Sequence, residues 1–289
     1  MAVASFALAG CQQVVDLGED GGASRITIES RLQVGAAVEV SMRVTDSFGA
    51  TASSSALAET TGVIDGSDGT SGTLYLHDIN EDVAKLRLDT LSIAEGVTYT
   101  LRLEAPGFAP ITSRTTVPRR VVLGAPPERP SGEQVGPRDS NFVRARLYFE
   151  DIPEEESYYH VLVTVVDALG DGREAPVAVD LKTDAGTLTD LVSGGATGTP
   201  FWLFDDRAFA GGVFDAELLV DAQQVAALAA PEVIVEVRTV SRSYYSYARA
   251  ELAQGVPVSA AAAVARDNVV GGGGLFGSYT TSVLRQRLR

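Results

Sequence analysis

Three kinds of residue in this 289-residue sequence are able to do chemistry: one cysteine, one pair of adjacent aspartates and a group of tyrosines. Cys11 is the only thiol, so the chain cannot form an intrachain disulfide. Asp205 and Asp206 follow an aromatic residue, where carboxylates either bind a cation or a ligand hydroxyl or accept backbone N–H bonds in a turn. The tyrosines either form a platform for a sugar or peptide or fill a core. We predict a ligand or partner surface made of Tyr158, Tyr159, Asp205, Asp206, Tyr245 and Tyr247.

No residue pattern in the sequence indicates a catalytic centre. The two histidines, His77 and His160, are far apart in the chain, which disfavours a His-rich zinc site or a Ser-His-Asp triad. The glycines at 271–274 are not followed by the Lys-Ser/Thr of a phosphate-binding loop. The acidic turn at 65–69 resembles the start of a calcium loop but lacks the distal glutamate and the helical flanks. We therefore expect a non-enzymatic protein with no catalytic residue, metal or cofactor.

The charge balance excludes one class of partner. The chain has a net charge of -15 and a sequence pI of about 4.5, and Lys85 and Lys182 are its only lysines. Nucleic-acid binding needs clustered positive charge that neutralises phosphates. We expect no nucleic-acid partner and a solvated acidic surface.

The N-terminus has the pattern of a lipid-attachment signal. Residues 1–10 are apolar and small, and Leu8-Ala9-Gly10-Cys11 has the form of a lipobox, in which the cysteine thiol accepts a diacylglycerol. The apolar run is shorter than the roughly 20 residues that span a bilayer. Because no Lys or Arg precedes it, we interpret residues 1–10 as a truncated signal peptide. Residues 11–23 then form a polar, glycine-rich tether that holds a folded part near the membrane.

The rest of the chain predicts an all-β fold with two β-sandwich-like domains. Short alternating segments are separated by Gly, Pro, Asp and Asn, and no segment keeps a helical period. Residues 24–118 have the size of an immunoglobulin-like or carboxypeptidase-regulatory-like domain. Prolines at 119–137 predict a linker, and residues 138–289 predict a larger β domain with short helical insertions near 222–230 and 244–252. The strands are expected at 25–32, 37–44, 72–77, 85–91, 98–104, 111–117, 142–149, 158–166, 177–181, 214–220, 233–240 and 278–283.

The glycine-rich segment at 271–274 predicts a structural feature. Glycines permit positive φ and a close approach of two backbones. We expect Phe276 to fill a core and to hold the C-terminal strand in place.

Several motifs occur in the order found in a known family. The lipobox cysteine is followed by Val15-Asp16-Leu17, and an acidic segment precedes two tyrosines (Pro153, Glu154, Tyr158, Tyr159). An aromatic-Asp-Asp stretch follows (Phe204, Asp205, Asp206, Phe209, Gly211, Gly212), then a serine with tyrosines (Ser243, Tyr245, Tyr247). The most specific motif is C-terminal: Asn268, Gly271, Gly272, Gly274, Phe276 and Gly277. On these motifs the chain resembles domain-of-unknown-function family 4249 over nearly its whole length.

The resemblance implies a location and a neighbourhood, and no catalytic residues. Members of that family are predicted outer-membrane lipoproteins of Gram-negative bacteria, encoded beside receptor genes. We therefore expect an outer-membrane, lipid-anchored protein that assists TonB-dependent nutrient uptake by binding a ligand or a transporter. The alternatives are a structural or adhesive envelope module, and a hydrolase that uses acidic residues.

The lipid anchor is testable by a single substitution. Replacing Cys11 by Ser removes the thiol that accepts the lipid, so the protein is expected to move from the membrane fraction to the soluble fraction. Fractionation followed by immunoblotting measures the shift. Retention of the Cys11→Ser variant in the membrane fraction would contradict the anchor.

Overall fold

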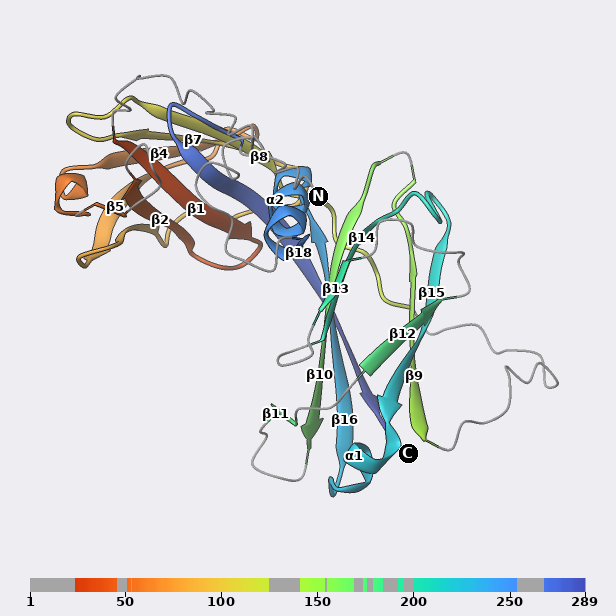
Figure 1. Cartoon of the computed structure of the whole chain (residues 1–289). Coiled ribbons are helices and arrows are strands. Elements are labelled where there is room, and N and C mark those ends of the chain that lie inside the picture. The colour runs from red at the N-terminus through yellow and green to blue at the C-terminus, as the bar shows by residue number, and fades with distance from the viewer. Residues whose placement is uncertain are drawn as a thin grey trace, which may run out of the picture.

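The computed structural model describes residues 24–45, 51–52, 54–124, 141–153, 155–168, 174–175, 179–183, 192–194, 200–253 and 268–288. Cys11, the expected signal peptide, the tether and most of the proline-rich linker lie outside these residues. Two β-rich halves meet at an angle, and one long strand passes through both (Figure 1). The all-β class predicted from the sequence is confirmed.

The N-terminal half is a sandwich of two small sheets. Strands β1, β2 and β6 form one layer, β4, β7 and β8 form the other, and β5 pairs with both β6 and β4 to close one side. Val40, Leu86 and Leu101 are fully buried between the layers. The elements are β1 (Arg25–Gln33), β2 (Val38–Thr45), β3 (Thr51–Ala52), the 3-10 helix η1 (Ser54–Leu57), β4 (Thr61–Gly66), β5 (Ser71–Ile79), β6 (Ala84–Leu88), β7 (Thr98–Glu104) and β8 (Ile111–Thr116).

The C-terminal half is a second sandwich. A sheet ordered β13-β14-β10-β16-β18 faces a three-stranded sheet ordered β12-β15-β9. Alternate residues of both sheets, such as Phe149, Val163, Phe214 and Val235, are fully buried between them. The elements are β9 (Phe142–Glu150), β10 (Tyr158–Asp167), β11 (Glu174–Ala175), β12 (Val179–Thr183), β13 (Val192–Gly194), β14 (Phe201–Asp205), β15 (Val213–Asp221), α1 (Ala222–Ala226), β16 (Pro231–Val240), α2 (Arg242–Ala253), β17 (Val269–Val270) and β18 (Gly273–Arg287).

Strand β18 belongs to both halves. Its residues 273–279 pair in parallel with β1, and its residues 279–287 pair antiparallel with β16. Tyr279 is the crossing point, because it is opposite Gln33 on one side and opposite Val240 on the other. In Figure 1 this strand runs from the N-terminal half to the far end of the C-terminal half. We call the region around Tyr279 the joint.

The C-terminal glycines make the corner at which the chain enters the N-terminal sandwich. Strand β17 pairs with β8 in one layer. After two intervening residues, β18 begins and pairs with β1 in the other layer. Gly271 and Gly274 have φ values of +82° and +108°. A Cβ on Gly271 would overlap the carbonyl oxygen of Pro110, and a Cβ on Gly274 would overlap that of Ile28. Only glycine fits both the angles and the space.

Two side chains fix this corner. Phe276 is fully buried in the core of the N-terminal half, and burying a phenylalanine contributes about 1.5–3 kcal/mol. The Asn268 amide donates to the Arg114 carbonyl (2.8 Å) and the Phe276 carbonyl (2.7 Å), and its oxygen accepts the Phe276 N–H (3.1 Å). Asn268 thereby joins β8 to β18 through their backbones. The prediction that the glycines allow close approach and that Phe276 fills a core is confirmed.

The structure differs from the expected division of the chain in one respect. The sequence pattern places residues 268–278 in the second domain, but Val269 and Phe276 lie in the core of the N-terminal half. The reason is the parallel pairing of β18 with β1, which joins residues about as far apart in sequence as the chain allows. The pattern also omits the strands β4 and β14. Glycines interrupt the alternation of β4, and β14 has a short apolar run instead of an alternating pattern.

The corner predicts a large difference between two glycine substitutions. Gly274→Ala combines an unfavourable φ with overlap of a backbone carbonyl, so it is expected to lower the free energy of unfolding by about 3 kcal/mol or more. Gly35→Ala is the matched control, because Gly35 has φ +79° but nothing within 4 Å of the position that a Cβ would take. It is expected to lose only about 1–2 kcal/mol. Urea unfolding of the full chain measures both. Equal losses would contradict the role assigned to close packing at Gly274.

Candidate functional site

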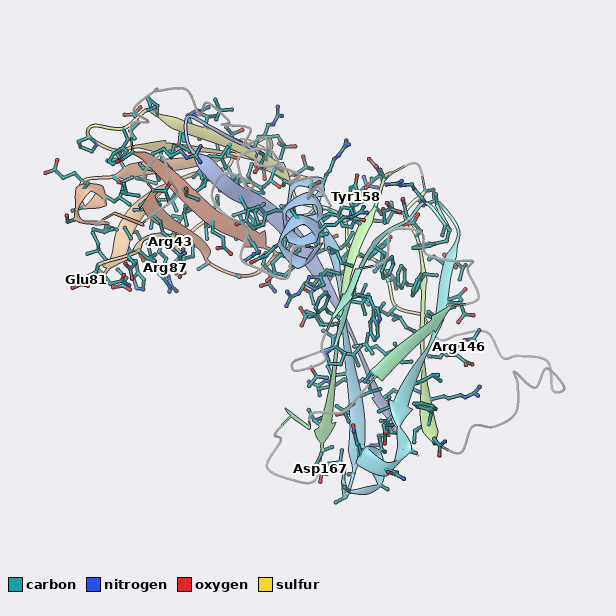
Figure 2. The ribbon with its side chains drawn as sticks, viewed as in Figure 1. Arg43, Glu81, Arg87, Arg146, Tyr158 and Asp167 are labelled. Carbon is teal, nitrogen blue, oxygen red and sulfur yellow. The ribbon has the colours of Figure 1, made fainter. Side chains whose placement is uncertain are left out.

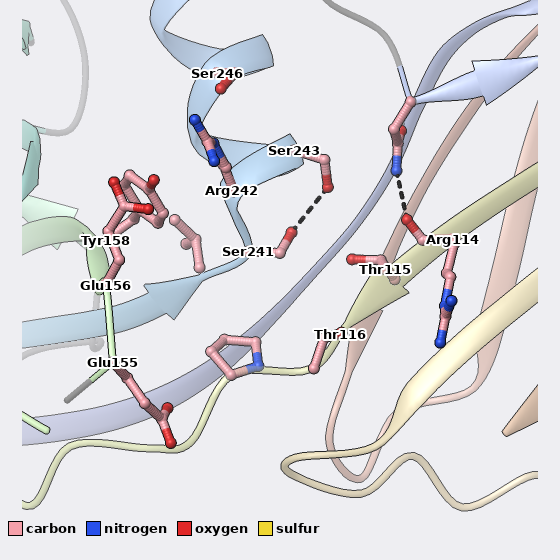
Figure 3. Close-up of a pocket in the computed structure, with 13 residues that line it drawn as sticks. Arg114, Thr115, Thr116, Glu155, Glu156, Tyr158, Ser241, Arg242, Ser243 and Ser246 are labelled. Carbon is pink, nitrogen blue, oxygen red and sulfur yellow. Dashed lines mark hydrogen bonds between the residues drawn. The ribbon is translucent and has the colours of Figure 1, made fainter. Parts of the chain in front are cut away.

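An open groove of about 570 Å³ lies at the joint. Four separate segments line it: the end of β8 with Pro118, the loop before β10, the turn from β16 into α2, and Asn268. Figure 3 shows these segments around the groove, with Glu155, Glu156 and Tyr158 on one side and Thr115, Thr116 and Arg114 on the other. A volume of this size accommodates a small ligand.

The groove rests on a network of hydroxyl groups that connects β8, β16 and β18. Thr115, Ser241 and Ser243 line the groove, and the fully buried Ser278 lies beneath them. The Ser278 hydroxyl donates to the Thr116 carbonyl (2.8 Å) and lies 3.0 Å from the Thr115 hydroxyl. The Ser241 hydroxyl accepts the N–H of Ser278 (3.1 Å) and lies 3.1 Å from the Ser243 hydroxyl, as drawn in Figure 3. Each half therefore contributes hydrogen bonds to the same few atoms, which holds the walls in place.

Helix α2 braces the joint with its tyrosines. Tyr244 lies against Tyr279 of β18, and its hydroxyl is 2.9 Å from His160 Nδ1 on β10. The Arg31 guanidinium of β1 lies 5.5 Å from the Tyr244 ring centre, a cation–π distance. Tyr245 stacks on Tyr158 with ring centres 4.6 Å apart. Gly277 makes room for this packing, since a Cβ there would lie 3.1 Å from that of Tyr244.

The structure corrects the predicted aromatic and acidic surface. Tyr158, Tyr245, Asp205 and Asp206 are only 3–6% exposed, and Tyr159 is fully buried; Tyr247 is half-buried. Tyr158 lies at the end of β10 that meets the joint, with Asp167 at the opposite end (Figure 2). Tyr158 pairs with Asp205 across β10 and β14 and stacks on Tyr245, but these side chains pack inward because α2 covers this end of β10. They form no open platform, and of this set only Tyr158 lines the groove.

The two aspartates hold loops in place. Asp206 accepts the N–H of Ser157 at 2.8 Å, and its own N–H donates to the Ser157 carbonyl at 3.1 Å. Asp205 accepts the N–H of Arg207 (3.3 Å), and its other oxygen lies 2.8 Å from the Arg207 guanidinium without the alignment of a hydrogen bond. Burial, opposed by the bond from Ser157 and reinforced by Asp151 and Asp205, raises the pKa of Asp206. The turn-forming interpretation of this pair therefore fits the contacts.

Charged residues on the rim are the groups that a ligand meets first. Arg114 and Arg242 are exposed, and neither has an ion-pair partner within the described residues. The two rim glutamates have partners. Glu155 lies 3.5 Å from Arg119, and burial, together with a hydrogen bond from its hydroxyl to Glu156, raises the pKa of Tyr158. Sequence reasoning missed Arg114 and Arg242. The signal for Arg242 was present in Ser241-Arg242-Ser243, a helix start with a capping serine.

A family model described as "Domain of unknown function (DUF4249)" matches residues 12–285. The chain belongs to this family. The most specific motif noted in the sequence, from Asn268 to Gly277, forms the glycine corner together with Asn268 and Phe276, the two residues that fix it. Ser243 and Tyr245, from another motif, lie in the groove floor and the aromatic brace.

The other comparisons are distant. A search of curated proteins gives no match. One matching crystal structure is that of a DUF4785 family protein from Legionella pneumophila, at 9% identity and a TM-score of 0.26. The alignment covers 75% of this chain and 52% of that one, so the chain spans about half the length of that structure. A likeness this weak carries no information about function.

The described residues contain neither a membrane-spanning helix nor a metal-binding cluster. In this part of the chain, neither helix is long and apolar enough to cross a bilayer. The same residues contain no group of three or more His, Cys, Asp or Glu side chains arranged to hold a metal ion.

His160, which contacts the Tyr244 hydroxyl, predicts a loss of stability in acid. Burial, with the nearby Arg238 and Arg31 guanidinium groups, lowers the pKa of His160 from 6.5 to about 4. The folded protein therefore binds this proton less readily than the unfolded chain does. The stabilisation by neutral His160 is complete above about pH 6.5 and is lost as the pH falls towards 4, amounting to ~3 kcal/mol at most.

Unfolding measured at pH 7 and pH 5 tests this. His160→Asn is expected to be less stable at pH 7 and to lose less stability on acidification than the wild type. His77→Asn, at an exposed position on β5, is the control and should leave the difference unchanged. An unaltered pH dependence in His160→Asn would contradict the role of this histidine.

Proposed function

We propose that this DUF4249 protein is a non-catalytic, lipid-anchored protein of the outer membrane that assists TonB-dependent uptake by binding a ligand or a transporter at the joint groove. The groove is the observation that carries the proposal. It is the place where both halves present polar groups to a space of ligand size. The lipobox at Cys11 and the tether of residues 11–23 support attachment to a membrane.

The construction of the groove supports binding. Its floor is fixed by hydrogen bonds between strands, so little ordering of side chains is needed when a ligand enters. The Ser246 hydroxyl of α2 faces the groove and has no partner within the described residues, so it is available to a ligand. Asp205 and Asp206, the adjacent acids singled out in the sequence, bind backbone and Arg207.

Capture of the partner tests the proposal. The whole chain is used, because β18 is shared and neither half is complete without it. Affinity purification of the tagged, crosslinked protein from its own cell envelope is expected to recover a TonB-dependent receptor. Ser246→Trp fills the groove and should lower that recovery several-fold. Val283→Trp adds the same side chain at an exposed position of β18 outside the groove and should not.

Recovery of unrelated abundant proteins alone, confirmed by mass spectrometry, would contradict the uptake role. Equal recovery with Ser246→Trp and Val283→Trp would place the receptor contact elsewhere on the molecule.

A further inference from the structure

Arg114 and Arg242 are unusual among the arginines of this protein. Most described arginines form an ion pair with a carboxylate, as Arg87 does with Asp89 (2.7 Å) and Arg238 with Glu236 (2.6 Å). Arg114 and Arg242 come from different halves of the molecule, yet both line the groove, and no described residue pairs with either. A guanidinium group has a rigid fork of donors that matches a carboxylate or another oxyanion.

The backbone around Arg242 adds further donors. Arg242 begins α2, a helix of twelve residues, and the N–H groups of Arg242 and Ser243 have no acceptor among the described residues. The first turn of a helix carries partial positive charge, which favours an anion there. Ser246, one turn later, contributes a hydroxyl with no partner in the described part of the chain.

The wall beside Arg242 limits how much negative charge the groove tolerates. Glu155 and Glu156 lie on the wall formed by the loop before β10 (Figure 3). Each contacts a neighbour, Arg119 or Tyr158, and both place a carboxyl group near the opening. A ligand with one negative charge meets the arginines with less repulsion than a dianion such as phosphate.

From these contacts we infer that the groove binds a small ligand with a single carboxylate, held by Arg242 and the first turn of α2, with Arg114 as a second positive charge across the groove. This inference rests on the proposed binding role of the groove and names the chemistry of its ligand. The neutral part of the ligand lies over Val240 and Pro118 and reaches the hydroxyl of Ser246. An acidic sugar and the C-terminus of a short peptide share this chemistry.

Titration calorimetry on the full chain, with matched acid and neutral compounds, tests the inference. One pair is d-glucuronate and its methyl ester, and the other is N-acetyl-trialanine and its C-terminal amide. Inorganic phosphate serves as the dianion. At least one acid is expected to bind about tenfold or more tightly than its neutral partner, and more tightly than phosphate. The pair that shows the preference identifies the source of the carboxylate.

Two variants with opposite expected effects make the test specific. Arg242→Gln should weaken binding of the acid about tenfold or more and leave the neutral compound unchanged. Glu156→Gln, which keeps an acceptor for Tyr158, should strengthen binding of the acid several-fold because it removes a like charge. Arg285→Gln is the control, since Arg285 is exposed outside the groove and pairs with Glu232 at 3.4 Å. Circular dichroism verifies that each variant is folded.

The outcomes separate this inference from the proposed function. Equal binding of acids and neutral compounds, abolished by Ser246→Trp, would overturn the carboxylate inference and leave the groove as a binding site. Binding of the acids that Arg242→Gln does not alter would also overturn it. If neither acid binds at millimolar concentration, the inference fails, whereas capture of the receptor is decided by its own experiment.

Discussion

The backbone hydrogen bonds of β18 are the constraint on which both halves of this molecule depend. A strand has two edges, and β18 uses one edge along its first half and the other along its second half. Without it, β1 and β16 would each be left with a long unpaired edge, and such edges are prone to association with other chains. The core of the N-terminal half would also lack Phe276. The two sandwiches are therefore structurally dependent on each other, although each has its own core.

The groove follows from that crossing. To reach β1, the chain must turn inside a space bounded by the carbonyl groups of Pro110 and Ile28, which only glycine permits. The strand then brings Phe276 and Ser278 beside the end of β8 and the start of α2, where backbone groups at strand ends need partners. Serine and threonine hydroxyls supply them. The same hydroxyls leave a polar, concave surface, so the site is a by-product of joining two sandwiches through one strand.

Sequence reasoning located elements better than it located their neighbours. Alternation placed most strands within a few residues of their observed bounds, because the side-chain period of a strand is visible in one sequence. The glycines at 271–274 were also interpreted correctly, since positive φ and close approach are properties of glycine itself. The partner of β18 was not predictable, because alternation determines which face is buried and not which core receives it. The tyrosines show the same limit: their type indicates an amphipathic role, and only the packing of α2 on β10 and β18 shows that they are buried.

The distribution of satisfied and unsatisfied groups indicates where selectivity in this groove resides. The hydroxyls of Ser241 and Ser243 in the floor, and of the buried Ser278 beneath it, already bond to one another or to backbone, so a ligand gains little by replacing those bonds. The groups that can still form hydrogen bonds with a ligand are at the rim and at the start of α2, and most of them are hydrogen-bond donors. A rigid floor with a charged rim discriminates between ligands by charge and its position more than by shape. In a protein with a net charge of -15, the pairing of most described arginines with acids makes the two unpaired groove arginines the chemically distinctive feature of the joint.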